Sequence, residues 1–307
     1  MTWLAQEVQH FVRAPDWTWY ILFYFFFAGL SGGSYVIASL FWLRGGPADE
    51  PVVRLGYIAS FVALLPCPVM LILDLGSPLR FWHMMWNTTP GDPGLNFKWY
   101  SPMSVGVWAL LIFGAFVTVS LLYALGWSFV RRVLGGVFGK VITVVGMIFG
   151  LFIAGYTGVL LSVSNQPVWS DTWALGGLFL ASGMSGSAAL LLLLLRLRKA
   201  GNAGPLLISE RLYAVLELAL LVVFVLTLIP AGMLDRAFEF PWLLLWLVAF
   251  AGLLPGIAGL AEGRLAVTPE GVVVPVESAS AAKTVLAPVL ILIGVLALRA
   301  AVIFPVH

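Results

Sequence analysis

The stretch GYTGVLLSVSNQPVWSDTW, residues Gly155–Trp173, joins two long apolar runs of the chain. Between the two runs lies a short group of polar residues that ends in a proline, Ser164–Pro167. A predominantly apolar run of about 20 residues is long enough to cross a bilayer as a helix. The stretch therefore predicts the connection between two membrane-spanning helices, with its polar side chains at the membrane boundary.

The composition of the whole chain agrees with this interpretation. Of its 307 residues, 61% are hydrophobic and only 10% are charged, and the mean hydropathy is +1.03. Soluble domains are about one quarter charged, so the numbers indicate an integral membrane protein. The net charge of +2 gives no reason to expect nucleic-acid binding. The single cysteine excludes disulfides within the chain and metal sites made of cysteine alone.

We predict an all-α integral membrane protein with eight transmembrane helices. Backbone groups in lipid must be hydrogen-bonded within the protein, which makes long apolar runs helical. The first residues lack the basic region and cleavage site of a signal peptide, so no cleaved segment is predicted. The eight predicted spans are about Trp17–Leu43, Val52–Leu75, Pro102–Leu125, Leu134–Ser162, Trp173–Leu195, Leu212–Leu234, Pro241–Ala261 and Val285–Ile303.

Two segments of the chain repeat one another. GLSGGSYVIASLFWLR begins at Gly29 and GMSGSAALLLLLLRLR begins at Gly183, and their small residues are of the kind that allows close helix packing. The repeat predicts two parallel four-helix halves. We therefore divide the sequence into an outer N-terminal segment (1–16), a first bundle (17–163) and a second bundle (164–303), which an inner loop (262–283) interrupts.

The distribution of charge predicts the orientation. Loops on the cytoplasmic side of a membrane carry an excess of Lys and Arg. Eleven such residues flank the connections after spans 1, 3, 5 and 7, and five lie on the other side, so both termini are predicted outside, in the periplasm of a bacterial inner membrane. Ten of the thirteen tryptophans fall on that outer side. They form either an aromatic belt or, in addition, a surface for a partner.

Several side chains are candidates for chemistry. None of the three histidines lies in a predicted span, so no haem is predicted, and no metal-ligand spacing is present. Glu217 is a functional candidate, because charges inside a membrane are costly. Tyr24 and Tyr156 are predicted at similar depth, with Gly29 and Gly155 beside them, which would suit a flat ring such as a quinone. The alternative is that these are ordinary interface tyrosines.

Four motifs together form a recognisable pattern. They are DLGSPLRFWHM from Asp74, WYSPMSVGVW from Trp99, GYTGVLLSVSNQPVW from Gly155 and LFLASGMSGSAALL from Leu178. Together they resemble the NrfD-like family, the membrane subunits of polysulfide reductase, of formate-linked nitrite reduction and of related complexes. The resemblance covers about Trp17 to Trp246.

The resemblance implies a haem-free subunit that binds menaquinone or ubiquinone near the outer face. The family's tyrosine at that site matches Tyr156, and Tyr24 stands where the family has a histidine. The proton acceptor is therefore open, with Asp74 and His83 as candidates. The implied partners are a ferredoxin-like iron–sulfur subunit, which would dock on the outer loop 74–101, and a molybdopterin catalytic subunit beyond it.

We therefore expect a quinone-reactive membrane anchor of a respiratory oxidoreductase complex, without activity of its own on the terminal substrate. One alternative adds proton translocation along a path that begins at Glu217. A second alternative is a secondary transporter, because internal repeats and intramembrane charge are typical of that class.

Overall fold

The computed structural model describes residues 15–17, 19–91, 93–199, 204–261, 265–267, 273–275 and 281–306. His10, His307 and nearly all of the predicted N-terminal segment 1–16 lie outside these ranges, as does most of the predicted loop 262–283.

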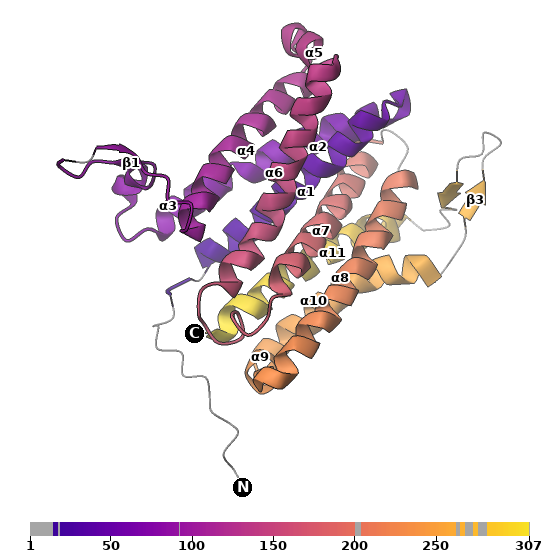
Figure 1. Ribbon diagram of the computed structural model, residues 1–307. Coiled ribbons are helices and arrows are strands. Elements are labelled where there is room, and N and C mark those ends of the chain that lie inside the picture. The colour runs from indigo at the N-terminus through magenta and orange to yellow at the C-terminus, as the bar shows by residue number, and fades with distance from the viewer. Residues whose placement is uncertain are drawn as a thin grey trace.

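The described chain is almost entirely helical (Figure 1). Short two-residue and three-residue strands form two antiparallel hairpins, β1 with β2 and β3 with β4. The second hairpin lies in the segment predicted as the inner loop 262–283. The elements in chain order are α1 (Trp19–Arg44), η1 (Pro47–Asp49), α2 (Glu50–Leu64), α3 (Pro66–Asp74), η2 (Pro78–Met84), β1 (Trp86–Asn87), β2 (Gly94–Leu95), α4 (Pro102–Ala124), α5 (Ser128–Leu134), α6 (Val137–Ser162), α7 (Leu175–Arg198), α8 (Gly204–Ala231), α9 (Leu234–Phe238), α10 (Trp242–Ala261), β3 (Leu265–Val267), β4 (Val273–Pro275), α11 (Ala281–Ile303) and η3 (Phe304–Val306).

The structure confirms an all-α integral membrane protein. Among the described residues, seven helical stretches are long and apolar enough to cross a membrane. The eighth predicted span corresponds to α10, whose apolar part Trp242–Ala258 is shorter. Each predicted span is helical, while the crossing of the membrane by all eight stays a prediction.

One helix begins earlier than predicted. Helix α8 begins at Gly204 and not near Leu212, because a proline at the start of a helix has a favourable backbone angle and needs no N–H partner. The prolines that open α3 do not break the helix either. Leu65, between α2 and α3, keeps an α-helical conformation, and its N–H donates to the Phe61 carbonyl at 3.2 Å.

The two repeated segments meet at the centre of the protein. Buried residues make up 83% of the apolar window in α1 and 78% in α7, against 28% in α4 and in α8. A methyl group added to Gly183 would lie 3.2 Å from the Cα atom of Gly29, and the Ser187 hydroxyl donates to the Leu30 carbonyl at 3.0 Å. The small residues of the repeat therefore let α1 and α7 pack backbone against backbone.

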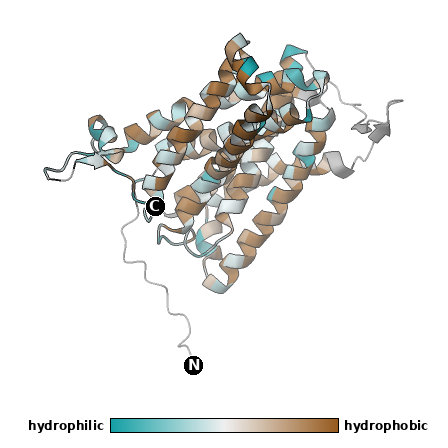
Figure 2. Ribbon diagram, turned by 45° about the horizontal axis from the view of Figure 1, so that its top comes forward, coloured by the Kyte–Doolittle hydropathy of each residue, from teal (hydrophilic) through white to brown (hydrophobic). Residues whose placement is uncertain are grey.

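The bundle has two chemically different ends. The tryptophan-rich end carries η2, the β1–β2 hairpin, α9 and both ends of the described chain, since the rings of Trp19 and Phe304 lie 5.1 Å apart (Figure 1). The opposite, basic end carries α5 and the residues Arg44, Arg54, Arg131, Arg132, Lys140, Arg196, Arg198, Lys199 and Arg211. Figure 2 shows the apolar surfaces along the helices between these ends.

One tryptophan of the opening stretch does not belong to a surface belt. Trp169 is completely buried, and its indole N–H donates to the carbonyl of Val302 in α11 at 2.7 Å. Its ring also stacks on Trp17 at 5.8 Å. The interpretation of Trp169 as a belt or partner-surface residue is therefore wrong, whereas Trp173 is 75% exposed. Position along the chain indicated the depth of Trp169 but not the direction of its side chain.

Candidate functional site

Tyr156 lies at the tryptophan-rich end, in the last two turns of α6, and it is buried. Its hydroxyl donates to the carbonyl of Pro102, the first residue of α4, at 2.6 Å. Its ring stacks on Phe152 one turn earlier, with centroids 5.3 Å apart. On the other side, the ring lies against Gly106, where any side chain would overlap it. The phenol is therefore held between α4 and α6 by one hydrogen bond and by the space that Gly106 leaves.

Tyr24 approaches the same region from α1. It is buried, and its phenol lies within electrostatic range of the phenol of Tyr156 and of the buried thiol of Cys67 in α3. Its ring contacts Phe25 at 5.5 Å. No hydrogen bond of the Tyr24 hydroxyl is found within the described ranges. The fold thus brings the two predicted tyrosines near one another from separate helices, and it leaves one phenol free to donate.

Asp74 and His83 lie in the outer part of this region. Asp74 is the last residue of α3, is half-buried, and interacts electrostatically with Asp16. His83 lies in η2, where its ring stacks on Trp82 at 3.8 Å and its Nδ1 atom is 3.0 Å from the Thr88 hydroxyl. These contacts of His83 remain within its own loop.

The two glycines of the predicted site lie in helix contacts with α7. A Cβ atom at Gly155 would be 3.3 Å from the carbonyl oxygen of Gly176. A Cβ atom at Gly29 would be 2.6 Å from the guanidinium of Arg299. Close packing explains both glycines, and a part in lining a ring site stays a prediction.

Glu217 is buried more deeply than its predicted place near the start of a helix. It follows Gly204, the first residue of α8, by 13 positions, which is roughly 20 Å along the helix. Its Oε2 atom is buried and makes no hydrogen bond with the described residues. The charged groups that act on it are Arg299 and Glu210, and the Ser185 hydroxyl faces it from α7.

Arg299 is completely buried in α11 although the bundle is apolar. Its Nε atom donates to the Phe25 carbonyl at 3.2 Å, and its Nη1 atom donates to the Ser182 hydroxyl at 2.9 Å. The guanidinium also lies 5.1 Å from the ring centroid of Phe179. One cation therefore joins α1, α7 and α11, and this satisfies the hydrogen-bonding demand of a charge inside a membrane.

Glu210 is a second buried acid on the same helix. It lies seven residues before Glu217, so both side chains share one face of α8. Its Oε1 atom has no hydrogen bond in the described part of the chain and lies against Gly256 of α10.

Sequence reasoning missed both Glu210 and Arg299. Glu210 could have been found from its seven-residue spacing to Glu217, which places both acids on one face of a helix. For Arg299 the signal was its place four residues before the end of an apolar span.

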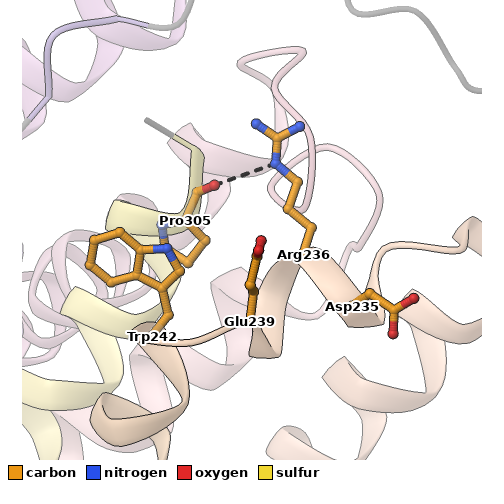
Figure 3. A pocket seen from close by; sticks show the side chains of 5 residues that line it. All are labelled: Asp235, Arg236, Glu239, Trp242 and Pro305. Carbon is orange, nitrogen blue, oxygen red and sulfur yellow. Dashed lines mark hydrogen bonds between the residues drawn. The ribbon is translucent and has the colours of Figure 1, made fainter.

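Two hollows lie elsewhere in the described part of the structure, and neither is lined by Tyr24 or Tyr156. The first, of about 620 Å³, is open at the tryptophan-rich end and is lined by Asp235, Arg236, Glu239, Trp242 and Pro305 (Figure 3). Its Arg236 donates from Nε to the Pro305 carbonyl at 3.3 Å, and its two carboxylates point apart. The second, of about 330 Å³, lies between α1 and α8. Within the described residues, no three His, Cys, Asp or Glu side chains come together as metal ligands.

Comparison with known proteins gives the family. The model of the family described as "Polysulphide reductase, NrfD" matches residues 6–307. The chain belongs to the NrfD family. Among curated NrfD-family relatives, the C chain of the polysulfide reductase of Wolinella succinogenes is 28% identical over 185 residues, which are 55% of this chain and 55% of that protein.

Two further relatives extend this comparison. Protein NrfD of Escherichia coli is 26% identical over 208 residues, which are 61% of each chain. The C subunit of the selenate reductase of Mesobacillus selenatarsenatis is 31% identical over 70 residues, which are 23% of this chain and 16% of that protein. The chain thus spans little more than half the length of the first two relatives.

Proposed function

We propose that this chain is the quinone-binding membrane subunit of a respiratory oxidoreductase complex, and that it exchanges electrons between the membrane quinone pool and an iron–sulfur partner. The observation that carries the proposal is the approach of two buried phenols, Tyr24 and Tyr156, at the tryptophan-rich end of an NrfD-family protein. Relatives named as parts of polysulfide and selenate reductases support a role within a larger complex.

The hydrogen-bond donors present suit the two oxygens of a quinone ring. A quinone offers two carbonyl oxygens as acceptors, and Tyr24, a buried residue, offers a phenol donor for which no hydrogen bond is found within the described ranges. The Tyr156 hydroxyl donates to the Pro102 carbonyl, so it would exchange this acceptor for a ring oxygen. The bound ring supplies a two-electron, two-proton redox couple, of either menaquinone or ubiquinone.

The remaining site residues would accept protons and bind the partner subunit. Asp74, half-buried at the end of α3, and His83 in η2 are the two candidate acceptors for protons that leave the Tyr24 region. The loop 74–101 is proposed as the docking surface of the iron–sulfur subunit, since Leu79, Trp99 and Tyr100 are between 68% and 91% exposed. Such apolar exposure is typical of an interaction surface.

Replacement of one hydroxyl tests the site. In the intact complex, Tyr156→Phe should lower quinol-linked turnover by about 100-fold, as expected for the loss of a proton-transfer group. Activity with an artificial electron donor should be unchanged. The matched control is Tyr20→Phe, which removes an exposed hydroxyl at the same end. Normal quinol turnover in the Tyr156 variant would refute the assignment.

A second candidate function is proton translocation through the membrane subunit. Glu210 and Glu217, two buried acids on one face of α8, favour it. Proton release across sealed vesicles should fall in Glu217→Gln at unchanged electron transfer, whereas Glu239→Gln, at an exposed acid, should release protons normally. Equal proton release in all three proteins would remove this candidate.

The secondary-transporter alternative has no supporting observation of this kind. Transporters typically interrupt a helix near the middle of the membrane. Here the helical conformation continues from α2 through Leu65 into α3, and α10 continues through Pro255. Co-purification distinguishes it from the first proposal. An iron–sulfur protein with bound quinone supports the redox subunit, and a lone chain that binds a solute supports the transporter.

A further inference from the structure

The hollow between α1 and α8 is built like a binding site for an amphipathic molecule. One face of α1 supplies Ile37, Leu40, Phe41 and Arg44, and one face of α8 supplies Pro205, Ile208, Ser209 and Tyr213. On each helix these residues recur at three-residue or four-residue spacing, which places them in one line. The groove thus follows the helix axes at the basic end, where α1 ends and α8 begins.

The groove is apolar in its depth and cationic at its mouth. Ile37 and Phe41 are buried, whereas the Arg44 side chain is 57% exposed. Seven residues separate Ile37 from Arg44, which is roughly 10 Å along the helix. Tyr213 starts deeper in α8, but helical side chains tilt toward the N-terminus, so its ring leans toward the basic end, where α8 begins.

The charged mouth retains capacity for an anion. Arg44 contacts Asp49 through Nε at 3.6 Å, and its other guanidinium N–H groups have no hydrogen bond in the described residues. Tyr213 adds a hydroxyl that likewise has no protein partner there. The same end of the bundle carries eight further Arg and Lys residues of the basic end defined above, which favours anions over neutral molecules.

The position of the groove favours a lipid over a protein segment. The groove lies between α1 and α8, and both helices are long and apolar enough to cross a membrane, so acyl chains of the bilayer surround its opening. An acyl chain with the glycerol next to it is narrow enough to enter from the bilayer.

We propose that the groove between α1 and α8 binds one anionic glycerophospholipid, with its phosphate at Arg44 and Tyr213 and an acyl chain along Ile37, Leu40 and Ile208. This site is separate from the tyrosine pair, which lies at the other end of α1. The lipid would fill the seam between a helix of the first half and a helix of the second, and it does not depend on the proposed quinone chemistry.

Lipid titration tests the proposal directly. The full chain with its natural partners is delipidated in detergent, then titrated with phosphatidylglycerol or with phosphatidylcholine of equal chain length, and lipid adducts are counted by native mass spectrometry. The wild type should bind one phosphatidylglycerol tightly. Arg44→Gln should weaken that step about fivefold, the usual contribution of one cation to anionic-lipid binding, and should lower the preference over phosphatidylcholine by the same factor.

Three variants make the result specific. Arg54→Gln removes an exposed cation at the same end and should leave the tight step unchanged. Asp49→Asn frees the Arg44 guanidinium and should keep or strengthen binding. Ile208→Trp fills the groove and should weaken both lipids, even where Arg44 is intact.

The opposite results are equally clear. Equal affinity for the two lipids would show that the groove does not recognise an anionic headgroup. An unchanged tight step in Arg44→Gln, or the same loss in Arg54→Gln, would show only general attraction to the basic end. Each of these results would overturn the site.

Discussion

The two halves of the protein share a repeat, and both bury hydroxyl groups, but they differ in buried charge. In the first half, the described spanning helices bury hydroxyl groups. Ser120 donates to the Tyr35 hydroxyl at 3.2 Å, the Ser39 and Tyr57 hydroxyls lie 3.2 Å apart, and Ser31 donates to the Ser60 carbonyl at 2.8 Å. All of these groups are neutral and are paired with one another.

The second half buries charge. Glu210 and Glu217 are 4% and 3% exposed in α8, and Arg299 is 0% exposed in α11. In the first half, the buried charge among the described residues is Asp49, and it lies in η1, before the long helix α2 begins.

The difference teaches that sequence similarity at a helix contact does not extend to the chemistry around it. Gly29 and Gly183 pack against each other, yet the atom nearest to an added Cβ at Gly29 belongs to Arg299, whereas the three atoms nearest to an added Cβ at Gly183 belong to Gly29. Neutral hydroxyl pairs contribute little energy each, while a buried ion depends strongly on its counter-charge. The halves should therefore respond differently to the loss of one buried group.

The largest effect is expected for Arg299→Met. The change removes four hydrogen bonds and leaves Glu217 buried without its counter-charge, so the free energy of unfolding should fall by about 3–5 kcal/mol. Unfolding in mixed micelles with increasing denaturing detergent measures the loss. The matched control is Arg132→Met, at an exposed arginine of the basic end. A loss below about 1 kcal/mol would show that the second half does not depend on this charge.

A double substitution sharpens the same point. If Arg299 and Glu217 act as a pair, Glu217→Gln combined with Arg299→Met should be less destabilising than the sum of the two single changes, by about 1–3 kcal/mol. The uncharged amide introduced by Glu217→Gln does not need Arg299 as a counter-charge. A double-mutant cycle on the unfolding free energies gives the coupling, and strict additivity would mean that the two residues are independent.

An intermediate effect is expected in the first half, at the neutral tyrosine site. Gly106→Ala would press on the ring of Tyr156, so stability should fall by about 1–3 kcal/mol and quinol-linked turnover should fall with it. The control is Gly114→Ala in the same helix, where the nearest atom is 3.7 Å from the added carbon. This control should be neutral or slightly stabilising. Equal effects of the two substitutions would contradict the crowding at Gly106.

The sequence predicted the helices well because one physical requirement, an apolar surface about 20 residues long, specifies them. It also predicted the common depth of Tyr24 and Tyr156, which the structure brings close together. Depth follows from position along a helix. The direction of a side chain around the helix depends on the neighbouring helices, which a single sequence does not reveal.

That distinction explains what could not be predicted. Trp169 and Trp173 are four residues apart in one connection, yet the first is buried against α11 and the second is exposed. Arg299 lies near the end of α11, where a charge is expected to face the membrane boundary. Its contacts with Phe25 and Ser182 place it inside the bundle instead.

The smallest effect is expected for the hydroxyl pairs of the first half. Tyr57→Phe removes one hydroxyl from its contact with Ser39 but keeps the ring, which packs on Tyr35 at a centroid distance of 5.4 Å. Hydrogen bonds between membrane helices contribute about 0.6 kcal/mol on average, so the loss of stability should be of that order. Detergent unfolding against wild type measures it, with Tyr123→Phe, at a tyrosine whose ring packs on Tyr57, as the matched control.

A loss of several kcal/mol in Tyr57→Phe would reverse the comparison between the halves. It would mean that the hydroxyls of Tyr57, Ser39 and Tyr35 act as one cooperative network and not as separate weak pairs, because only a shared network makes one neutral group so costly to remove. Ser120→Ala then distinguishes the two cases. In a network it should be as destabilising as Tyr57→Phe, although Ser120 bonds to Tyr35 and not to Tyr57. With separate pairs, the two effects should be small and additive.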